Sequence, residues 1–367
     1  MTIGVLGAGQ LGWMLALAGQ PLGLRFRFLD PSGEAPAGRI APLITADYND
    51  LLALERFARG LDRVTYEFEN VPVASALFLQ QKIPVYPPPR ALETAQDRLN
   101  EKEMFQLLDI PVPPFAPVSS ADEFAEAVQR VGLPGVLKTR RMGYDGKGQA
   151  VIRSRDDVPD AWDALGNVPL IYERFVEFER ELSILAVRGC DGGADFYPLV
   201  ENHHAGGILR RSLAPAPLIS PKAQSIAEEY ARRALTQLGY VGALAIEFFQ
   251  TRDGLLANEM APRVHNSGHW SIEGAETSQF ENHVRAVAGL PLGSTEISGC
   301  SAMLNLIGST PDPAAILAVP FAHLHHYGKA PRPGRKLGHV TLRAPDYATL
   351  NERLSRLAPL IECESDV

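Results

Sequence analysis

The chain has 367 residues, more than one hydrophobic core usually supports, so we expect two or three domains. Its hydrophobic content of 46% and charged content of 21% are typical of a soluble globular protein. The net charge of -8 argues against a nucleic-acid-binding protein, and the three scattered cysteines suit a reducing cytoplasm rather than a disulfide framework.

The N-terminal quarter of the chain alternates between predicted strands and helices. Its first 24 residues are uncharged, but Gly, Gln and Pro interrupt them, which argues against a membrane span or a signal peptide. Short apolar runs predict strands at residues 3–7, 24–29 and 64–69, and helices are predicted at residues 10–18 and 50–59. This alternation indicates a parallel sheet with right-handed crossovers.

A glycine-rich turn joins the first predicted strand to the first predicted helix. Its sequence, Gly7-Ala8-Gly9-Gln10-Leu11-Gly12, matches the G-x-G-x-x-G pattern, and Asp30 ends the next strand. In a dinucleotide-binding enzyme this acid would hold the ribose hydroxyls. The pattern by itself indicates only a phosphate site, because the backbone N–H groups of glycines at a helix N-terminus bind any phosphate group. A purely structural tight turn is the other interpretation.

A second glycine-rich loop, from Gly143 to Gly148, follows a predicted strand that carries Lys138. It lacks the G-K-[ST] end of a Walker A motif, and a mobile flap whose amides fold over a polyphosphate fits better. Lys138, a point charge on a strand, would then reach the α- and β-phosphates. Alternatively, the loop is an exposed hairpin turn with solvated charges.

Glu247 and Glu259 lie on two short apolar strands that flank the turn Thr251-Arg252-Asp253-Gly254. A three-residue loop with Gly254 in the left-handed conformation would pair Thr251 with Leu255 and place the glutamates directly opposite each other. Opposed carboxylates about 5 Å apart repel each other, so they need a cation such as Mg²⁺ between them. A two-residue Asp253-Gly254 loop would shift the register by one and put the glutamates on opposite faces of the hairpin.

Functional groups are dense directly after Arg263, which is typical of a substrate-facing loop. They are His265, Asn266, Ser267, His269 and Trp270. Near the C-terminus, a basic loop over residues 329–336 is stiffened by two prolines, which favours an anion-binding site over a solvated surface. His323, His325 and His326 have no Cys or acid nearby in the sequence, so we predict structural roles for them rather than a metal site.

Seven segments carry a resemblance to a known family. They are GAGQLGWML, TYEFENV, GYDGKGQ, FYPLVEN, GYVGALAIEFF, NEMAPRVHNSGHW and HHYGKAPRPGRKLGH. In this order they resemble the ATP-grasp superfamily, and within it the 5-(carboxyamino)imidazole ribonucleotide synthases. The resemblance implies a mixed α/β and α+β class: a Rossmann-like pre-ATP-grasp domain (1–95), an ATP-grasp domain (96–295, with a flexible lid at about 115–175) and a small β-rich C-terminal domain (296–367).

The resemblance also implies a reaction of purine biosynthesis. ATP phosphorylates bicarbonate to carboxyphosphate, and the amine of 5-aminoimidazole ribonucleotide then takes up the carboxyl group, leaving ADP and phosphate. The implied protein is a cytoplasmic homodimer that uses ATP and Mg²⁺, with Mn²⁺ as an alternative, and has no nucleic-acid or membrane partner.

The family motifs imply roles for individual residues. Glu247 and Glu259 would be the metal ligands; the catalytic residues would be Lys138, Asp145, Arg263 and His265, with Asp145 and His265 as candidates for the general base. The expected ATP site comprises Arg98, Lys138, Gly143, Tyr144, Asp145, Gly146, Lys147, Gly148, Gln149, Glu173, Arg174, Phe175, Val176, Glu181, His204, Asn258 and Glu259. The expected nucleotide-substrate and bicarbonate contacts are Gly9, Gln10, Leu11, Glu67, Tyr144, Asp145, Arg263, His265, Asn266, Ser267, Lys329 and Arg335, with the 5′-phosphate on the Gly7–Gly12 turn.

Three other functions compete with this one. Another ATP-grasp ligase, using formate or an amino acid, would lack the HNSGHW and RPGRK elements. An NAD-dependent dehydrogenase built on Gly7–Gly12 would give no role to the glutamate hairpin. A silent nucleotide-binding regulator would have lost a catalytic position, and none is lost here.

Overall fold

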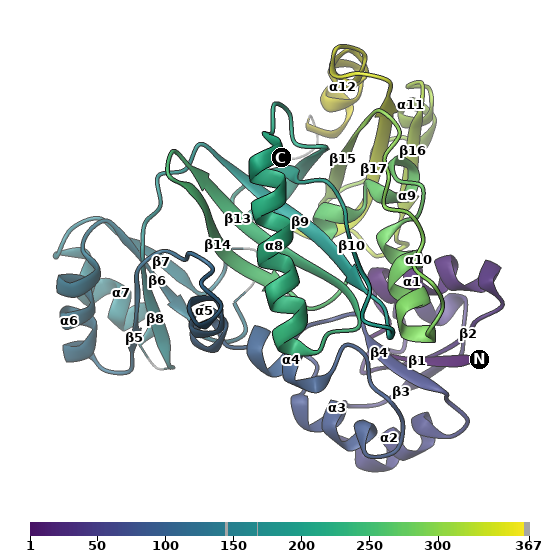
Figure 1. The fold of residues 1–367 in the computed structure, drawn as a ribbon, viewed down its shortest axis with the longest axis horizontal. Coiled ribbons are helices and arrows are strands. Elements are labelled where there is room, and N and C mark those ends of the chain that lie inside the picture. The colour runs from purple at the N-terminus through teal and green to yellow at the C-terminus, as the bar shows by residue number, and fades with distance from the viewer. Residues whose placement is uncertain (144–145, 167, 363–367) are drawn as a thin grey trace.

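The computed structural model describes residues 1–143, 146–166 and 168–362, which form three sheets (Figure 1). The N-terminal sheet is parallel, with the order β3-β2-β1-β4. Its strands are β1 (Thr2–Leu6), β2 (Arg25–Asp30), β3 (Leu43–Thr45) and β4 (Arg63–Tyr66). The accompanying helices are α1 (Gln10–Gly19), α2 (Leu51–Ala58) and α3 (Val73–Gln80), with short 3-10 turns η1 (Gln20–Leu22) and η2 (Pro36–Arg39). The predicted alternation of strands and helices is confirmed.

A small antiparallel sheet stands at the left of Figure 1, with the order β5-β8-β6-β7. Its strands are β5 (Phe115–Val118), β6 (Gly135–Thr139), β7 (Gln149–Ile152) and β8 (Leu170–Arg174), and helices α6 (Ala121–Val131) and α7 (Asp157–Leu165) cover it. The unit has a hydrophobic core of its own, in which Phe124 packs edge-on against Tyr172. It coincides with the segment expected to act as a lid.

Helices α4 (Pro89–Ala95) and α5 (Arg98–Leu107) connect the N-terminal sheet to this unit. Asp97 lies just before α5 and caps it. Its carboxylate accepts a hydrogen bond from Leu99 N at 3.1 Å and forms an ion pair with Arg140 at 2.7 Å. The cap fixes the first turn of α5, which carries Arg98.

The largest sheet has nine strands, in the order β14-β13-β9-β11-β12-β15-β17-β16, with β10 paired to β9. Its strands are β9 (Arg180–Arg188), β10 (Ala194–Phe196), β11 (Val200–Ala205), β12 (Ile208–Ala214), β13 (Gly242–Thr251), β14 (Gly254–Ala261), β15 (Cys300–Ile307), β16 (Ala322–His326) and β17 (Lys336–Ala344). Because β15 pairs with β12, the C-terminal strands extend the central sheet rather than forming a separate one. The predicted domain boundaries stay predictions.

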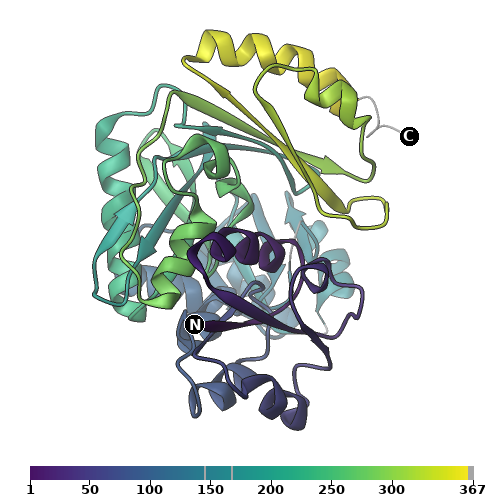
Figure 2. The ribbon, with the colours of Figure 1, turned by 90° about the vertical axis from the view of Figure 1, so that its right-hand side faces the viewer.

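Helices cover both ends of this sheet. α8 (Pro221–Leu238) buries an apolar stripe of Ala227, Ala231, Ala234, Leu235 and Leu238, with the spacing of an amphipathic helix. η3 (Asn266–Gly268), α9 (Ser271–Gly274) and α10 (Gln279–Ala288) follow the hairpin, and α10 shares a hydrophobic core with α1. Figure 2 shows α12 (Tyr347–Glu362) lying along the C-terminal strands, near α11 (Pro313–Leu317). Among the described residues, no helix is both long and apolar enough to cross a membrane.

The hairpin of β13 and β14 forms as predicted, but its loop has two residues and not three. Thr251 pairs with Gly254, whose φ of 135° lies outside the left-handed helical region that the prediction assumed. The pairing then passes from Phe248–Ala257 directly to Glu247–Glu259, so Asn258 is the extra residue of a β-bulge. The bulge compensates for the shorter loop. The predicted pairing of the two glutamates is therefore confirmed, while the predicted loop is wrong.

Candidate active site

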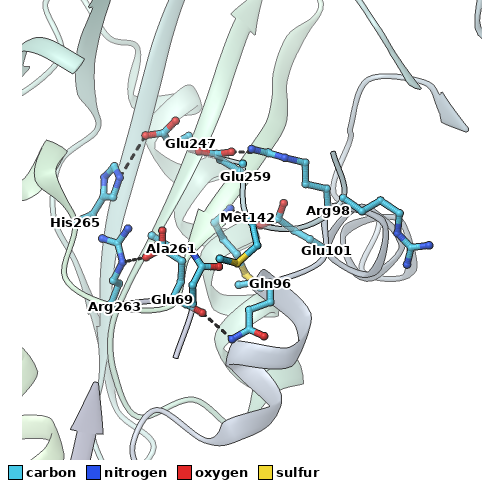
Figure 3. A pocket seen from close by; sticks show the side chains of 15 residues that line it. Glu69, Gln96, Arg98, Glu101, Met142, Glu247, Glu259, Ala261, Arg263 and His265 are labelled. Carbon is cyan, nitrogen blue, oxygen red and sulfur yellow. Dashed lines mark hydrogen bonds and ion pairs between the residues drawn. The ribbon is translucent and has the colours of Figure 1, made fainter. Parts of the chain in front are cut away.

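Glu247 and Glu259 lie together in a cavity lined by the α4–α5 segment, the start of the glycine flap, the hairpin and the loop after it (Figure 3). Arg98 Nη1 donates a hydrogen bond to Glu259 Oε2 at 2.7 Å, and His265 Nε2 lies 3.6 Å from Glu247 Oε1. Burial and repulsion from Glu259 raise the pKa of Glu247 to about 7. Burial also raises the pKa of Glu259, but the charge of Arg98 and its hydrogen bond outweigh this and bring it to about 2. One carboxylate thus has a fixed guanidinium partner, while burial and the neighbouring charge raise the pKa of the other.

The loop after the hairpin brings Arg263 and His265 into the same cavity. Arg263 Nε forms an ion pair with Glu69, and its Nη1 donates to Val264 O at 3.0 Å. Burial, followed by the charges of Arg263 and Lys336, lowers the pKa of His265 to about 3. Its imidazole is therefore neutral at neutral pH, with Nδ1 lying 2.9 Å from Ser267 Oγ.

The side chains of Asn266 and Ser267 are held by hydrogen bonds to residues of the central sheet. The side-chain amides of Asn266 and Asn305 bond each other, at 3.1 Å and 2.7 Å in the two directions, and Ser183 Oγ donates to Ser267 Oγ at 2.8 Å. Asn305 belongs to β15, so the C-terminal strands contribute to the position of this loop.

The residues expected to hold ATP lie between the small sheet and the central sheet. Lys138 Nζ is 3.1 Å from Glu173 Oε2, and His204 Nδ1 is 2.6 Å from Glu181 Oε2. Glu173 Oε1 and Asn258 Oδ1 are buried acceptors without a hydrogen-bond partner among the described residues. Buried acceptors are normally satisfied, so these atoms are suited to the donors of a bound ligand.

The expected ATP contacts near the flap are arranged around the turn between β6 and β7, where Lys138 pairs with Gln149. Gly143 lines the cavity, and Gly148 O accepts a hydrogen bond from Thr139 N at 2.8 Å. A Cβ on Gly146 would lie 3.1 Å from Gly207 Cα, so the flap backbone closely approaches the β11–β12 turn. Gly146 and Lys147 are exposed. Tyr144 and Asp145 lie outside the described residues.

The expected ATP contacts at the end of β8 and just after it are tied to the small sheet and its helix α6. Arg174 Nη1 donates to Val131 O at 3.0 Å, at the end of α6, and Phe175 N donates to Pro134 O at 3.0 Å. Phe175 is exposed and Val176 half-buried.

The glycine-rich turn Gly7–Gly12 leads into α1, with Gly9 as the N-cap residue. Its amides hold a carboxylate of the protein itself: Gly9 N and Gly12 N both donate to Glu67, the latter at 2.5 Å, and Ala8 N donates to Asp30 Oδ2 at 2.9 Å. An acid of the protein therefore lies at this helix N-terminus, and the placing of the 5′-phosphate on the Gly7–Gly12 turn stays a prediction. Burial raises the pKa of Glu67, against the two amide hydrogen bonds.

The basic loop over residues 329–336 reaches the same turn from the C-terminal region. Lys329 Nζ donates to Gln10 Oε1, and Arg39 Nη2 donates to Gly328 O at 2.7 Å. Arg335 Nη1 donates to Ala330 O at 3.1 Å, within the loop. Burial, with the charges of Arg335 and Lys336, lowers the pKa of Lys329 to about 8, although Glu67 acts in the opposite direction. Gln10 and Lys329 thus form a second group, beside the cavity of the glutamates, and Leu11 follows on α1.

Of the three histidines on β16, His325 has an acid beside it that is distant in the sequence. His325 Nε2 lies 2.8 Å from Glu273 Oε1, and its ring stacks on that of His339 with centroids 4.4 Å apart. Among the described residues, no group of three or more His, Cys, Asp or Glu side chains is arranged to hold a metal ion. The contacts of His325 are those of a structural residue.

Comparison with known proteins gives the chain its place. Family models match three consecutive parts: the ribonucleotide synthetase preATP-grasp domain at residues 1–96, the ATP-grasp domain at 103–280, and the phosphoribosylaminoimidazole carboxylase C-terminal domain at 301–353. The N5-carboxyaminoimidazole ribonucleotide synthase of Pseudomonas aeruginosa is 56% identical over 364 residues, which cover 99% of this chain and 100% of that protein. The chain belongs to the N5-carboxyaminoimidazole ribonucleotide synthase family.

Solved structures of N5-carboxyaminoimidazole ribonucleotide synthases agree. The Thermus thermophilus synthetase is 60% identical, covers 98% of each chain and superposes with a TM-score of 0.95. The Aspergillus clavatus synthase, solved with ADP and 5-aminoimidazole ribonucleotide, is 32% identical, covers 99% of this chain and 98% of its own, and has a TM-score of 0.92. The family, the fold class and the class of enzyme predicted from the sequence are confirmed, and the dehydrogenase alternative is set aside.

Several cavity residues of this synthase fold were not singled out from the sequence. They are Glu69, Asn70, Gln96, Glu101, Arg140 and Met142. Glu69 lies in the TYEFENV segment that supports the resemblance, so its position was a usable signal. The others come from segments without a distinct signal of their own, and the fold brings them to the glutamates.

Proposed function

We infer that the protein is an ATP-dependent carbon–nitrogen ligase of purine biosynthesis. It carboxylates 5-aminoimidazole ribonucleotide with bicarbonate to the N5-carboxyamino product, and releases ADP and phosphate. The observation that carries the proposal is the opposed pair Glu247 and Glu259, with Arg98 and Arg263 at the same cavity. Phosphoryl transfer needs a bound metal ion and positive charge on the phosphoryl oxygens, and two carboxylates and two guanidiniums that line one cavity suit both needs.

We propose that Glu247 and Glu259 hold Mg²⁺ or Mn²⁺ together with ATP. Carboxylate oxygens are the ligands that these hard cations prefer, and burial and mutual repulsion already raise the pKa of Glu247 to about 7. The ion would neutralise charge on the transferring phosphoryl group. Because two carboxylates leave much of the coordination shell of such an ion open, phosphate oxygens and water would supply the other ligands.

The chemistry divides into two displacements. A bicarbonate oxygen attacks the γ-phosphorus and ADP leaves, giving carboxyphosphate; the substrate amine then attacks the carboxyl carbon, and phosphate leaves with the former bicarbonate oxygen. Lys138 and Arg263 would hold the phosphoryl oxygens. The proton lost by the amine needs an acceptor, for which His265 and Asp145 are the proposed residues; His265 is neutral and can accept it, although its low pKa makes it a weak base.

The decisive experiment measures ADP release with each substrate omitted in turn. We expect release only when bicarbonate and 5-aminoimidazole ribonucleotide are both present, because attack by the amine completes the cycle. ADP release that is unchanged without the ribonucleotide, or that depends on formate or an amino acid, would contradict the proposal.

We further propose that the protein is a homodimer of the cytoplasm, as the family resemblance implies. Its three cysteines, scattered in the sequence, suit a reducing compartment. Sedimentation equilibrium tests the assembly: a monomer at micromolar concentration would contradict it.

Lys329 gives the proposal a pH dependence. If its ammonium binds the 5′-phosphate of the ribonucleotide, affinity requires the charged form, which is lost as pH rises through the pKa of about 8. The KM for the ribonucleotide should therefore rise between pH 7 and 9, while the KM for ATP should not. Lys329→Arg keeps the charge over this range and should flatten the profile, whereas an unchanged profile in Lys329→Met would assign the titration to another group.

A further inference from the structure

Three charged side chains from three elements meet on the nucleotide side of the candidate site. Glu173 Oε2, on β8, lies 3.2 Å from Lys102 Nζ on α5 and 3.1 Å from Lys138 Nζ on β6. A single carboxylate oxygen therefore faces two ammonium groups. The second oxygen, Oε1, is buried and has no hydrogen-bond partner within the described part of the chain. Such a cluster has one positive charge more than its carboxylate can neutralise.

The two lysines differ in their freedom. The side chain of Lys102 is 0% exposed, and its Nζ also donates to Ala257 O on β14 at 3.3 Å. The side chain of Lys138 is 12% exposed and belongs to the strand that leads into the flap. Lys102 is enclosed by protein, while Lys138 has solvent access and can change partner.

A change of partner by Lys138 has an electrostatic cost. The side chain of Glu173 is 2% exposed, and a buried carboxylate without a cation is strongly unfavourable. Burial raises the pKa of Glu173, but the charges of Lys102 and Lys138 outweigh this and bring it to about 2, so the group stays ionised. A cation must remain on Glu173 when Lys138 leaves. Lys102, at 3.2 Å and held by Ala257 O, is in position to do so.

We propose that Lys102 is a positioning residue for nucleotide binding, which remains on Glu173 as a fixed counter-ion and thereby releases Lys138 to the phosphates. The inference rests on the proposed function, which assigns Lys138 to ATP. Without Lys102, Glu173 retains Lys138 as its ion-pair partner, and the phosphates lose a positive charge. Lys102 itself touches neither nucleotide nor metal.

The test compares a ligand with phosphates to one without them. In Lys102→Met, which keeps the length and the apolar stem of the side chain, the Kd for ADP should rise about tenfold or more, while the Kd for adenosine stays within about twofold. Both are measured by competition with a fluorescent nucleotide. Lys82→Met is the matched control, because Lys82 pairs with Glu55 on the surface, with exposures of 41% and 46%, and should change neither value. Equal weakening of ADP and adenosine would mean a packing defect and would overturn the proposal.

A second variant separates charge from packing. Adding Glu173→Gln to Lys102→Met removes the carboxylate that retains Lys138, so the Kd for ADP should fall back to that of Glu173→Gln alone. A double variant that binds ADP more weakly than either single variant would refute the mechanism.

The unmodified protein provides a test that does not depend on the folding of a variant. In a crystal structure with ADP, Lys138 Nζ should lie on a phosphate oxygen and Lys102 Nζ should remain within hydrogen-bond distance of Glu173. If Lys138 stays on Glu173 alone, or Lys102 leaves it, the proposal fails. The substrate-dependent ADP release described above is a separate measurement, so failure of the proposed function would be recognised independently.

Discussion

Glutamine in place of Glu247 or of Glu259 lowers ADP release by at least about a thousandfold when both substrates are saturating. Each substitution removes a negative charge and a carboxylate oxygen from the pair proposed to hold the metal and the nucleotide. The loss should appear in kcat, measured by steady-state ADP release at high Mg²⁺. Glu103→Gln is the matched control, because Glu103 is exposed on α5, and should retain full activity.

The unfolding temperatures of Glu247→Gln and Glu259→Gln should differ. They also show whether a variant has lost activity because a metal ligand is missing or because the fold is damaged. The pKa of Glu247 is raised from 4.5 to about 7, so this group contributes stability below pH 4.5 that is lost as pH rises through 7. At pH 8, without metal, its ionised carboxylate is buried beside Glu259, so Glu247→Gln should unfold at the same or a higher temperature than the unmodified protein. Glu259→Gln takes the partner from Arg98 and should unfold at a lower one. An active Glu247→Gln, or an inactive one with a clearly lower Tm, would contradict the assignment.

Substitution of Arg263 is expected to lower activity nearly as much as substitution of Glu247 or Glu259. Arg263→Lys should lower kcat/KM by about a hundredfold or more, because an ammonium cannot reproduce the planar, multiple hydrogen bonding of a guanidinium to Glu69 and to a phosphoryl oxygen together. Kinetics with bicarbonate, ATP and the ribonucleotide varied in turn would show the loss. Arg252→Lys, at the exposed tip of the hairpin, should have no effect.

A charge-removing variant tests whether Arg263 acts in catalysis or only in the fold. Arg263→Leu leaves the carboxylate of Glu69 without its partner and should lower the free energy of unfolding by about 3 kcal/mol. Adding Glu69→Gln should recover most of this stability but none of the activity. Recovery of activity in the double variant would reduce Arg263 to a structural partner of Glu69.

The glutamate hairpin shows how far local sequence rules reach. The alternation of apolar residues and the Asp253-Gly254 turn were sufficient to predict two paired strands. Turn chemistry alone left two loop lengths and two registers open, and the bulge at Asn258 decided the outcome. The bulge lies on β14, where Met260 N beside it donates a hydrogen bond to Glu101 of α5, a long-range contact that no pattern within the hairpin records.

The contacts of Glu67 and Lys102 lie beyond local patterns for a different reason. Glu67 was expected to contact the substrate, but it reaches the amides of Gly9 and Gly12 at the start of α1. Lys102 looks like an ordinary surface lysine of an amphipathic helix until α5 is packed between two sheets. The sequence could therefore predict the fold, the family and the residue types of the site, but not which charges neutralise one another.

The pairing of β12 with β15 has a consequence for any attempt to dissect the molecule. A chain shortened to end before Cys300 would leave the backbone N–H and C=O groups of β12 open along its outer edge. Such an edge recruits strands from other molecules, so the truncated protein should precipitate or form larger particles rather than survive as a smaller catalytic unit. Strand β15 covers the edge of β12 and so protects the protein from self-association through this edge. A fusion partner is therefore better joined to the N- or C-terminus than inserted between β12 and β15.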